Sequence, residues 1–136
     1  MRAYVDSSVL LRFVLGEPNR LKGFGRVTRP IASELIRLEC LRTIDRARLR
    51  LGVSDDAIAT RRAAVLQRLE AFDLIRVGSD VLERAAEPFP TTLDSLDAIH
   101  LASALLARDG ASALAFATHD TELATAARAV GFRLLT

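Results

Sequence analysis

Hydrophobic residues along this chain are spaced in two ways, as short apolar runs and as longer stretches with helical periodicity. The short runs predict strands at residues 3–5, 30–32, 74–77, 113–117 and 132–135. The longer stretches predict helices at residues 9–15, 33–51, 54–72, 79–87, 96–108 and 121–130. Because strands that alternate with helices form a parallel sheet with helices on both faces, the predicted fold class is α/β, with a mainly parallel central sheet of about five strands.

The most apolar stretch, residues 93–108, predicts a buried helix. From residue 96 onward it is apolar on nearly every side, as expected of a helix surrounded by other elements. Asp97 lies near its start, and His100 and Ser103 follow at intervals of three residues. An ionised carboxylate is costly in apolar surroundings unless a partner or a metal compensates it, so Asp97 is the first candidate functional residue.

Serine and glycine residues mark where the first helices are expected to begin and end. The expected caps at the helix starts are Ser7 or Ser8, then Ser33, then Ser54. Gly52 leaves so short a turn between the second and third helices that residues 34–72 are expected to form an antiparallel hairpin. The predicted core stripe of its first helix consists of Ile36, Cys40, Ile44, Ala47 and Leu51.

Length and composition indicate one ordinary globular domain over residues 1–136. Half of the residues are apolar and 26% are charged, and no apolar run approaches the roughly 20 residues of a membrane span. The N-terminus enters strand-like sequence without the apolar segment of a signal peptide. Cys40 is the only cysteine, which excludes an internal disulfide and leads us to expect a cytoplasmic protein.

The charge balance permits a nucleic-acid partner. The formal net charge is only +2, but the sequence pI is about 9.3. Lys22 is the sole lysine, so the other 18 of the 19 basic residues are arginine. Arginine suits planar, bidentate contacts to phosphate, although a coding bias toward arginine accounts for the same composition. The segment 17–29 is basic and interrupted by glycine, and we expect it to be a loop with at most one helical turn.

Four acidic residues are expected near one edge of the sheet. Asp6 directly follows the first strand and Asp120 the fourth, and ligands of parallel α/β sheets bind beyond the carboxyl ends of the strands. Asp97 and Glu39 lie on helices whose N-terminal halves should face the same edge. Two carboxylates at 4 Å repel by about 4 kcal/mol at an effective dielectric constant of 20. Mg²⁺ or Mn²⁺ would offset this repulsion and could support phosphodiester hydrolysis.

Each of these acids also has a purely structural explanation. Asp6 and Asp120 could be helix N-caps, and Asp97 could be a first-turn acid favoured by the helix dipole. Glu39 could be a solvated residue paired with Arg42 at i+3.

The two histidines and the cysteine need no metal either. We expect His100 and His119 to be hydrogen-bonding neighbours of the acids, and Cys40 to be part of the core.

Four blocks of the sequence, AYVDSSVLL, SELIRLECLR, SLDAIHLASAL and ATHDTELATAAR, resemble in this order the conserved blocks of PIN-domain proteins. The overall size and the helical hairpin after the second block resemble the VapC-type toxins of bacterial toxin–antitoxin pairs. This resemblance covers essentially the whole chain. It implies a PIN-like three-layer α/β/α sandwich and a Mg²⁺- or Mn²⁺-dependent endoribonuclease.

The resemblance also assigns roles to individual residues. The predicted catalytic and metal-binding set is Asp6, Glu39, Asp97 and Asp120, of which Asp6 and Asp97 are the expected direct ligands. The polar residues expected to support these acids are Ser7 and Thr118. Spacing rather than the resemblance adds Arg42, Arg46 and Arg50, a stripe at i+4 intervals beside Glu39, as candidate contacts for RNA phosphate or an acidic partner. A solvated arginine face accounts for the same spacing. One departure concerns the last block, in which Glu122 stands where some relatives carry another acid.

The same resemblance implies an RNA substrate and a cognate protein antitoxin as partners, in a homodimer or a toxin–antitoxin hetero-oligomer. Two other enzyme classes fit poorly: an aspartyl phosphatase needs an acid where Ser8 stands, and a phospho-receiver domain needs a late lysine. The stronger alternative is a catalytically weak PIN-like protein or RNA-binding module that acts through partner recognition. Binding of divalent metal at the four acids would distinguish the two.

Overall fold

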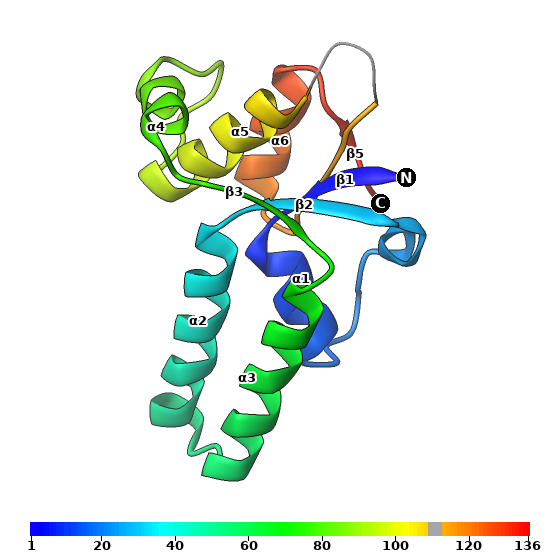
Figure 1. Cartoon of the computed structure of the whole chain (residues 1–136), viewed down its shortest axis with the longest axis vertical. Helices are drawn as coiled ribbons and strands as arrows, with labels where there is room; N and C mark the ends of the chain where they lie inside the picture. The colour runs from blue at the N-terminus through cyan, green and yellow to red at the C-terminus, as the bar shows by residue number, and fades with distance from the viewer. Residues whose placement is uncertain (109–112) are drawn as a thin grey trace.

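The computed structural model describes residues 1–108 and 113–136 of the chain. Within this part, a single parallel sheet contains the strands β1 (Arg2–Val5), β2 (Arg29–Ser33), β3 (Asp73–Ile75), β4 (Ala115–Ala117) and β5 (Arg133–Leu134). Their order is β3-β2-β1-β4-β5, and every neighbouring pair is parallel (Figure 1). The predicted α/β class with a central parallel sheet is confirmed.

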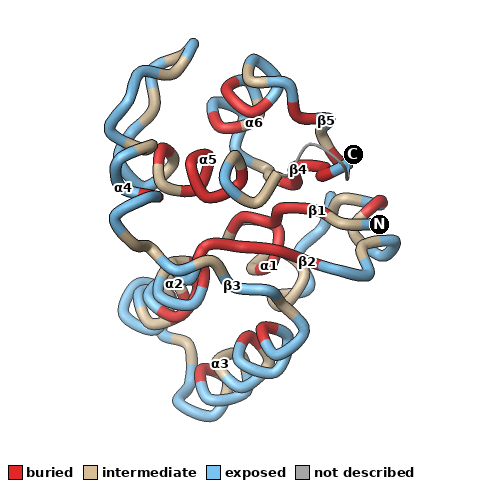
Figure 2. Tube along the Cα trace, turned by 45° about the horizontal axis from the view of Figure 1, so that its top comes forward, coloured by how far each residue is buried: buried red, intermediate tan, exposed pale blue. Residues whose placement is uncertain are grey.

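Helices cover both faces of this sheet. They are α1 (Ser7–Val14), α2 (Leu35–Leu51), α3 (Asp55–Leu69), α4 (Ser79–Ala86), α5 (Ser95–Ala107) and α6 (Thr121–Ala129), with a short 3₁₀ helix η1 (Lys22–Arg26). Figure 2 shows α1, α2 and α3 on one side of the strands and α5 and α6 on the other, with α4 beside α5. The three-layer α/β/α arrangement is therefore confirmed. No helix in the described ranges is both long and apolar enough to span a membrane.

The strand sequences supply both layers of the core because successive side chains point to opposite faces. On β1, Tyr4 joins the core cluster that contains residues of α5 and α6, whereas Ala3 and Val5 join the cluster beneath the opposite face. Phe116 of β4 lies on the same face as Tyr4, and their rings stack at a centroid distance of 5.1 Å. Both faces of the central strands are buried, as expected of a parallel sheet covered by helices.

The cap of α1 differs from the prediction. Asp6 is the N-cap, because its Oδ1 accepts a hydrogen bond from the backbone N–H of Val9, and Ser7 and Ser8 lie inside the helix. Asp6 has the extended backbone that an N-cap needs, since it directly continues β1. The proposed structural role of Asp6 as a helix N-cap is therefore correct.

The second helix also begins later than predicted. Ser33 is the last residue of β2 rather than the cap of α2, and its Oγ accepts a hydrogen bond from the N–H of Leu35. Ser54 does cap α3, as predicted. Gly52 adopts the left-handed conformation, with φ of 61°, that permits the short turn between α2 and α3.

The α2–α3 hairpin is confirmed, but its predicted core stripe extends too far. Burial on α2 ends at Ile44, and Leu51 is 76% exposed. A helix of 17 residues is roughly 25 Å long, whereas the five residues of β2 span roughly 17 Å. The C-terminal half of α2 therefore extends past the sheet, where α3 is its neighbour (Figure 1).

Helix α5 is also less enclosed than its sequence predicts. Leu96 and Leu106 are 49% and 48% exposed, because α5 is an outer-layer helix with only one face against the sheet. That inner face nevertheless contains two fully buried polar residues, His100 and Ser103. A buried imidazole needs hydrogen-bonding partners, and these lead to the candidate site.

Candidate functional site

The candidate site lies at the carboxyl ends of β1 and β4. The strand order reverses between these two strands, since β2 and β3 lie beyond β1 on one side and β5 lies beyond β4 on the other. β1 runs directly into Asp6, whose backbone N–H donates to the carbonyl of Ala117 at 3.1 Å. Thr118 and Asp120 follow β4 at the same edge. In parallel α/β sheets this position is where ligands bind, so the topology agrees with the prediction for Asp6 and Asp120.

Asp6 is the most enclosed acid of the site, with only 4% of its surface exposed. Its Oδ1 accepts from the Ser8 hydroxyl, and its Oδ2 accepts from the Thr118 hydroxyl at 2.5 Å. Burial raises the pKa of Asp6, although the hydrogen bonds from Ser8 and Thr118 and the charge of His100 act in the opposite direction. The protein thus holds a carboxylate in a place that disfavours its charge, with polar hydrogens fixing its orientation.

Glu39 is tied to the site through a buried chain of hydrogen bonds. Its Oε1 lies 2.5 Å from Nε2 of His100, and Nδ1 of the same imidazole lies 2.8 Å from the hydroxyl of Tyr4. That hydroxyl in turn accepts from the backbone N–H of Ser33 at 3.0 Å. Tyr4 is completely buried, and burial raises its pKa far above the ordinary value.

The direction of the hydrogen bond between His100 and Glu39 follows from the chemistry of the carboxylate. A carboxylate oxygen accepts, so Nε2 of His100 carries a proton and donates to Glu39, and Nδ1 shares the second hydrogen bond with the Tyr4 hydroxyl. Burial alone would lower the pKa of His100, but the hydrogen bond to Glu39 and the charges of Glu39, Asp6 and Asp97 raise it. His100 therefore holds the side chain of Glu39 in a fixed orientation, and the predicted pairing of Glu39 with Arg42 is replaced by this contact.

Asp97 and Asp120 occupy the starts of the two helices that follow the site. Asp97 is in the first turn of α5, where its N–H donates to the capping residue Asp94 at 2.9 Å. Burial raises the pKa of Asp97 to about 6, and the charges of Asp94, Asp120 and Asp6 act in the same direction. Asp120 caps α6 through Leu123, as the structural explanation proposed.

The donor chemistry of these residues fits a hard divalent cation. Their side chains offer carboxylate oxygens. Burial disfavours the charge of Asp6, and burial and neighbouring acids disfavour that of Asp97. Within residues 1–108 and 113–136, however, no three His, Cys, Asp or Glu side chains are grouped closely enough to hold a metal ion as they stand. Asp6 is instead hydrogen-bonded to Ser8 and Thr118, and Glu39 to His100.

The remaining predicted residues differ in whether they contact the acids of the candidate site. Ser7 is part of α1, but the hydroxyl that contacts Asp6 is that of Ser8. Thr118 contacts two of the predicted acids, since its hydroxyl donates to Asp6 and its Oγ1 accepts from the N–H of Asp120. The imidazole of His119 has a buried Nε2 without a hydrogen-bond partner in the described structure, while its backbone N–H donates to Ser8.

The predicted arginine stripe lies on the exposed part of α2. Arg42 pairs with Asp45 at 3.3 Å, and Arg46 donates to Thr43 at 3.4 Å. Arg46 and Arg50 line a surface pocket of about 420 Å³. The stripe is thus accessible, with one of its three charges already partnered.

Sequence reasoning missed Tyr4 and Ser8. Ser8 carries a signal, since it stands two residues after an acid that follows a strand. Tyr4 carries none, because a tyrosine inside an apolar strand is ordinary and its contact with His100 spans 96 positions of the sequence.

A parallel sheet in this strand order, with acids at the switch between β1 and β4, defines the class of protein. Residues 3–129 match the PIN domain family, and the chain belongs to this family.

Two named relatives of this chain are ribonucleases. The chain is 32% identical to Ribonuclease VapC46 of Mycobacterium tuberculosis over 135 residues, which cover 97% of this chain and 95% of that protein. It is also 32% identical to Ribonuclease VapC47 of the same species over 136 residues, covering 95% and 92%.

Solved structures show the same fold. One is a toxin–antitoxin complex from Klebsiella pneumoniae, with a TM-score of 0.65 and 19% identity over 88% of each chain. Another is PAE2754 from Pyrobaculum aerophilum, with a TM-score of 0.62 and 21% identity over 95% of this chain and 87% of that one.

Proposed function

We propose that this chain is a Mg²⁺- or Mn²⁺-dependent endoribonuclease and the toxin of a toxin–antitoxin pair. The observation that supports the proposal is the buried carboxylate of Asp6 at the switch between β1 and β4, together with Asp97, whose pKa is raised by burial and by the charges of Asp94, Asp120 and Asp6. The names of the two Mycobacterium tuberculosis relatives, both ribonucleases, support an RNA substrate.

Asp6 and Asp97 are the expected direct ligands of the metal. When bound, a divalent ion would polarise the scissile phosphodiester, activate a water and stabilise the leaving oxygen. Ser8 and Thr118 orient Asp6 by donating to its two carboxylate oxygens. His100 orients Glu39 in the same way, so that a shift of either acid has to break a buried hydrogen bond.

The test compares Asp6→Asn and Asp97→Asn with the matched control Asp94→Asn. Asp94 is an exposed acid three residues before Asp97, and asparagine caps a helix as well as aspartate does. We expect the first two variants to lose Mn²⁺-dependent cleavage of single-stranded RNA and to lose Mn²⁺ binding in calorimetry. The control should keep both. Wild-type cleavage rates in purified Asp97→Asn would contradict the assignment, and a wild type without cleavage would favour a protein that acts through partner recognition.

An antitoxin is the expected protein partner. The amphipathic α2–α3 hairpin offers a surface for an apolar helix, and a basic antitoxin side chain could reach the acids and compete with the metal. We therefore expect antitoxin affinity to weaken as Mn²⁺ rises at constant ionic strength in the wild type, and to do so less in Asp6→Asn. A flat response in the wild type would mean that the antitoxin inhibits by covering the RNA site instead.

A further inference from the structure

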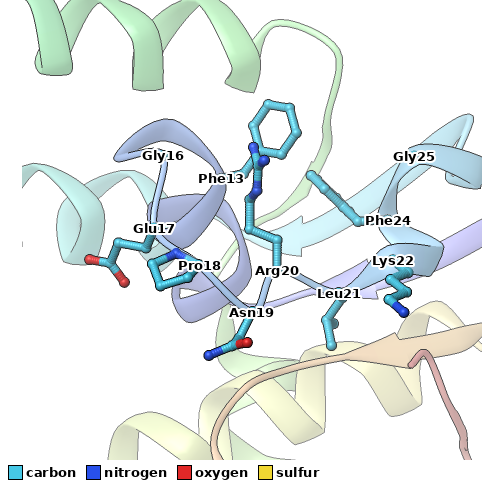
Figure 3. A pocket seen from close by; sticks show the side chains of 10 residues that line it. All are labelled: Phe13, Gly16, Glu17, Pro18, Asn19, Arg20, Leu21, Lys22, Phe24 and Gly25. Carbon is cyan, nitrogen blue, oxygen red and sulfur yellow. The ribbon is translucent and has the colours of Figure 1, made fainter.

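A cavity of about 670 Å³ lies between the C-terminal end of α1, the loop that follows it and η1. We call it the loop pocket. Figure 3 shows that Arg20 extends from the loop toward the ring of Phe13, with Phe24 beside it, and that Lys22 lies at the far end. A second cavity of about 550 Å³ continues on the α3 side, and Phe13 lines both. The two therefore form one open surface, to which α3 contributes Arg68.

Positive charge gathers at this surface without acidic partners. The guanidinium carbon of Arg68 lies 4.2 Å from the centre of the Phe13 ring, and that of Arg20 lies 5.6 Å from the same centre. None of the ion pairs found among the described residues includes Arg20, Arg68 or Lys22. Glu17, the acid that lines the pocket, is paired with Arg12. Two guanidinium groups beside one ring, neither of them in an ion pair within the described residues, attract an anion.

A series of side-chain contacts along α1 links the candidate site to the loop pocket. Ser8 contacts both Asp6 and the backbone of His119, and Arg12 stands one helical turn further along the same face. Arg12 in turn pairs with Glu17 and donates to the carbonyl of Asn19, two residues that line the pocket. The pocket therefore begins on the order of 10 Å from Asp6, given the rise of an α-helix. A nucleic-acid strand held at the site would reach it within a few nucleotides.

We propose that the loop pocket binds single-stranded RNA a few nucleotides from the scissile phosphate, with Arg20 and Arg68 as the contacts. This inference rests on the proposed function. A guanidinium group stacked on Phe13 still offers its N–H groups to a phosphate and its outer face to a nucleobase. Positive grooves with aromatic side chains are how proteins bind single strands without reading their sequence. The subsite thus adds affinity for longer RNA and leaves the chemistry at the acids unchanged.

The experiment measures RNA binding by fluorescence anisotropy in a non-cleaving Asp97→Asn background. Fluorescein-labelled single-stranded RNAs of two lengths are compared, a trinucleotide and a dodecanucleotide. The test variant carries Arg20→Gln with Arg68→Gln, and the matched control carries Arg128→Gln with Arg133→Gln, two exposed arginines on α6 and β5. A further variant, Arg20→Lys with Arg68→Lys, keeps both charges and removes the planar groups.

For the dodecanucleotide, we expect the glutamine test variant to weaken affinity at least tenfold and to reduce the slope of log K against log salt by about 1 to 1.5. The trinucleotide and the control should change less than twofold, and the lysine variant should fall between. In the protein with Asp97 intact, Arg20→Gln with Arg68→Gln should raise KM for long RNA and leave kcat unaltered.

Equal losses in the control pair, or equal losses for the trinucleotide, would overturn the subsite, because they would indicate charge alone or a damaged fold. Binding of polyglutamate but not RNA, lost on the same substitutions, would also overturn it and assign the pocket to an acidic protein. Failure of the proposed function has a different signature, in which the wild type does not cleave any RNA with Mn²⁺.

Discussion

The buried hydroxyl of Tyr4 offers a sharp test of how the site is held together. In Tyr4→Phe the ring keeps its place against Phe116, at a centroid distance of 5.1 Å, and loses only the oxygen. Two buried groups then lose a partner: the N–H of Ser33 at 3.0 Å and Nδ1 of His100 at 2.8 Å. Ser33 is wholly buried and His100 is 2% exposed, so water does not replace the lost oxygen.

The expected cost is large for so small a change. Each buried polar group left unsatisfied costs about 1–3 kcal/mol, so the loss of two partners should lower the free energy of unfolding by about 2–6 kcal/mol. This is a substantial part of the roughly 5–15 kcal/mol that stabilises a domain. With a urea m-value of about 2 kcal/mol/M, the unfolding midpoint should fall by about 1 to 3 M.

The matched control is Thr125→Val, which removes an exposed hydroxyl that donates to Thr121 within α6, and it should cost less than about 0.5 kcal/mol. Mn²⁺ calorimetry on the folded Tyr4→Phe variant adds a functional reading. If the hydroxyl locks His100 against a metal-binding Glu39, Mn²⁺ affinity should fall by about tenfold or more. An unfolding midpoint equal to that of the wild type would refute the reasoning.

Three further outcomes follow from the charges and burial described above. Because the pKa of Asp97 is about 6 in the folded protein and near 3.8 unfolded, metal-free stability should rise as pH falls from 7.5 to 5, and Asp97→Asn should flatten this profile in urea titrations. A profile for Asp97→Asn that is as steep as the wild type's would contradict this. Burial raises the pKa of Cys40 to about 12, so its thiol should resist Ellman's reagent at pH 8 until denaturant is added; rapid labelling of the folded protein would show an open core. Replacing Arg42, Arg46 and Arg50 by glutamine should lower the slope of log K against log salt for RNA binding by about 1 to 1.5, because Arg42 is already paired with Asp45 and only two charges are free. An unchanged slope would mean that these arginines do not contact RNA.

The order and type of the elements could be predicted from the sequence because they depend on local spacing. Apolar runs such as residues 3–5 and 113–117 correspond to β1 and β4, and the alternation with helices implies a parallel sheet. The position of Asp6 and Asp120 after two strands likewise follows from the chain alone. Parallel strands end at one edge, so residues that follow them are brought together whatever the details of packing.

The boundaries of burial could not be predicted in the same way. Leu51 continues the apolar stripe of α2 and Leu96 that of α5, yet both are largely exposed. Periodicity indicates which side of a helix is apolar, but the length of the neighbouring element decides how much of that side is covered. The short sheet leaves the end of α2 beyond its reach.

Composition and motif by themselves determined the class of this protein and predicted which residues would carry its chemistry, because residue type and position after a strand are properties of the chain. Only the tertiary structure decided how those residues are held. The contact of Glu39 on α2 with His100 on α5 joins positions 61 residues apart, and Tyr4 of β1 extends it. Such hydrogen bonds depend on which helix packs on which face of the sheet, and this arrangement arises from all the core contacts together rather than from any local pattern.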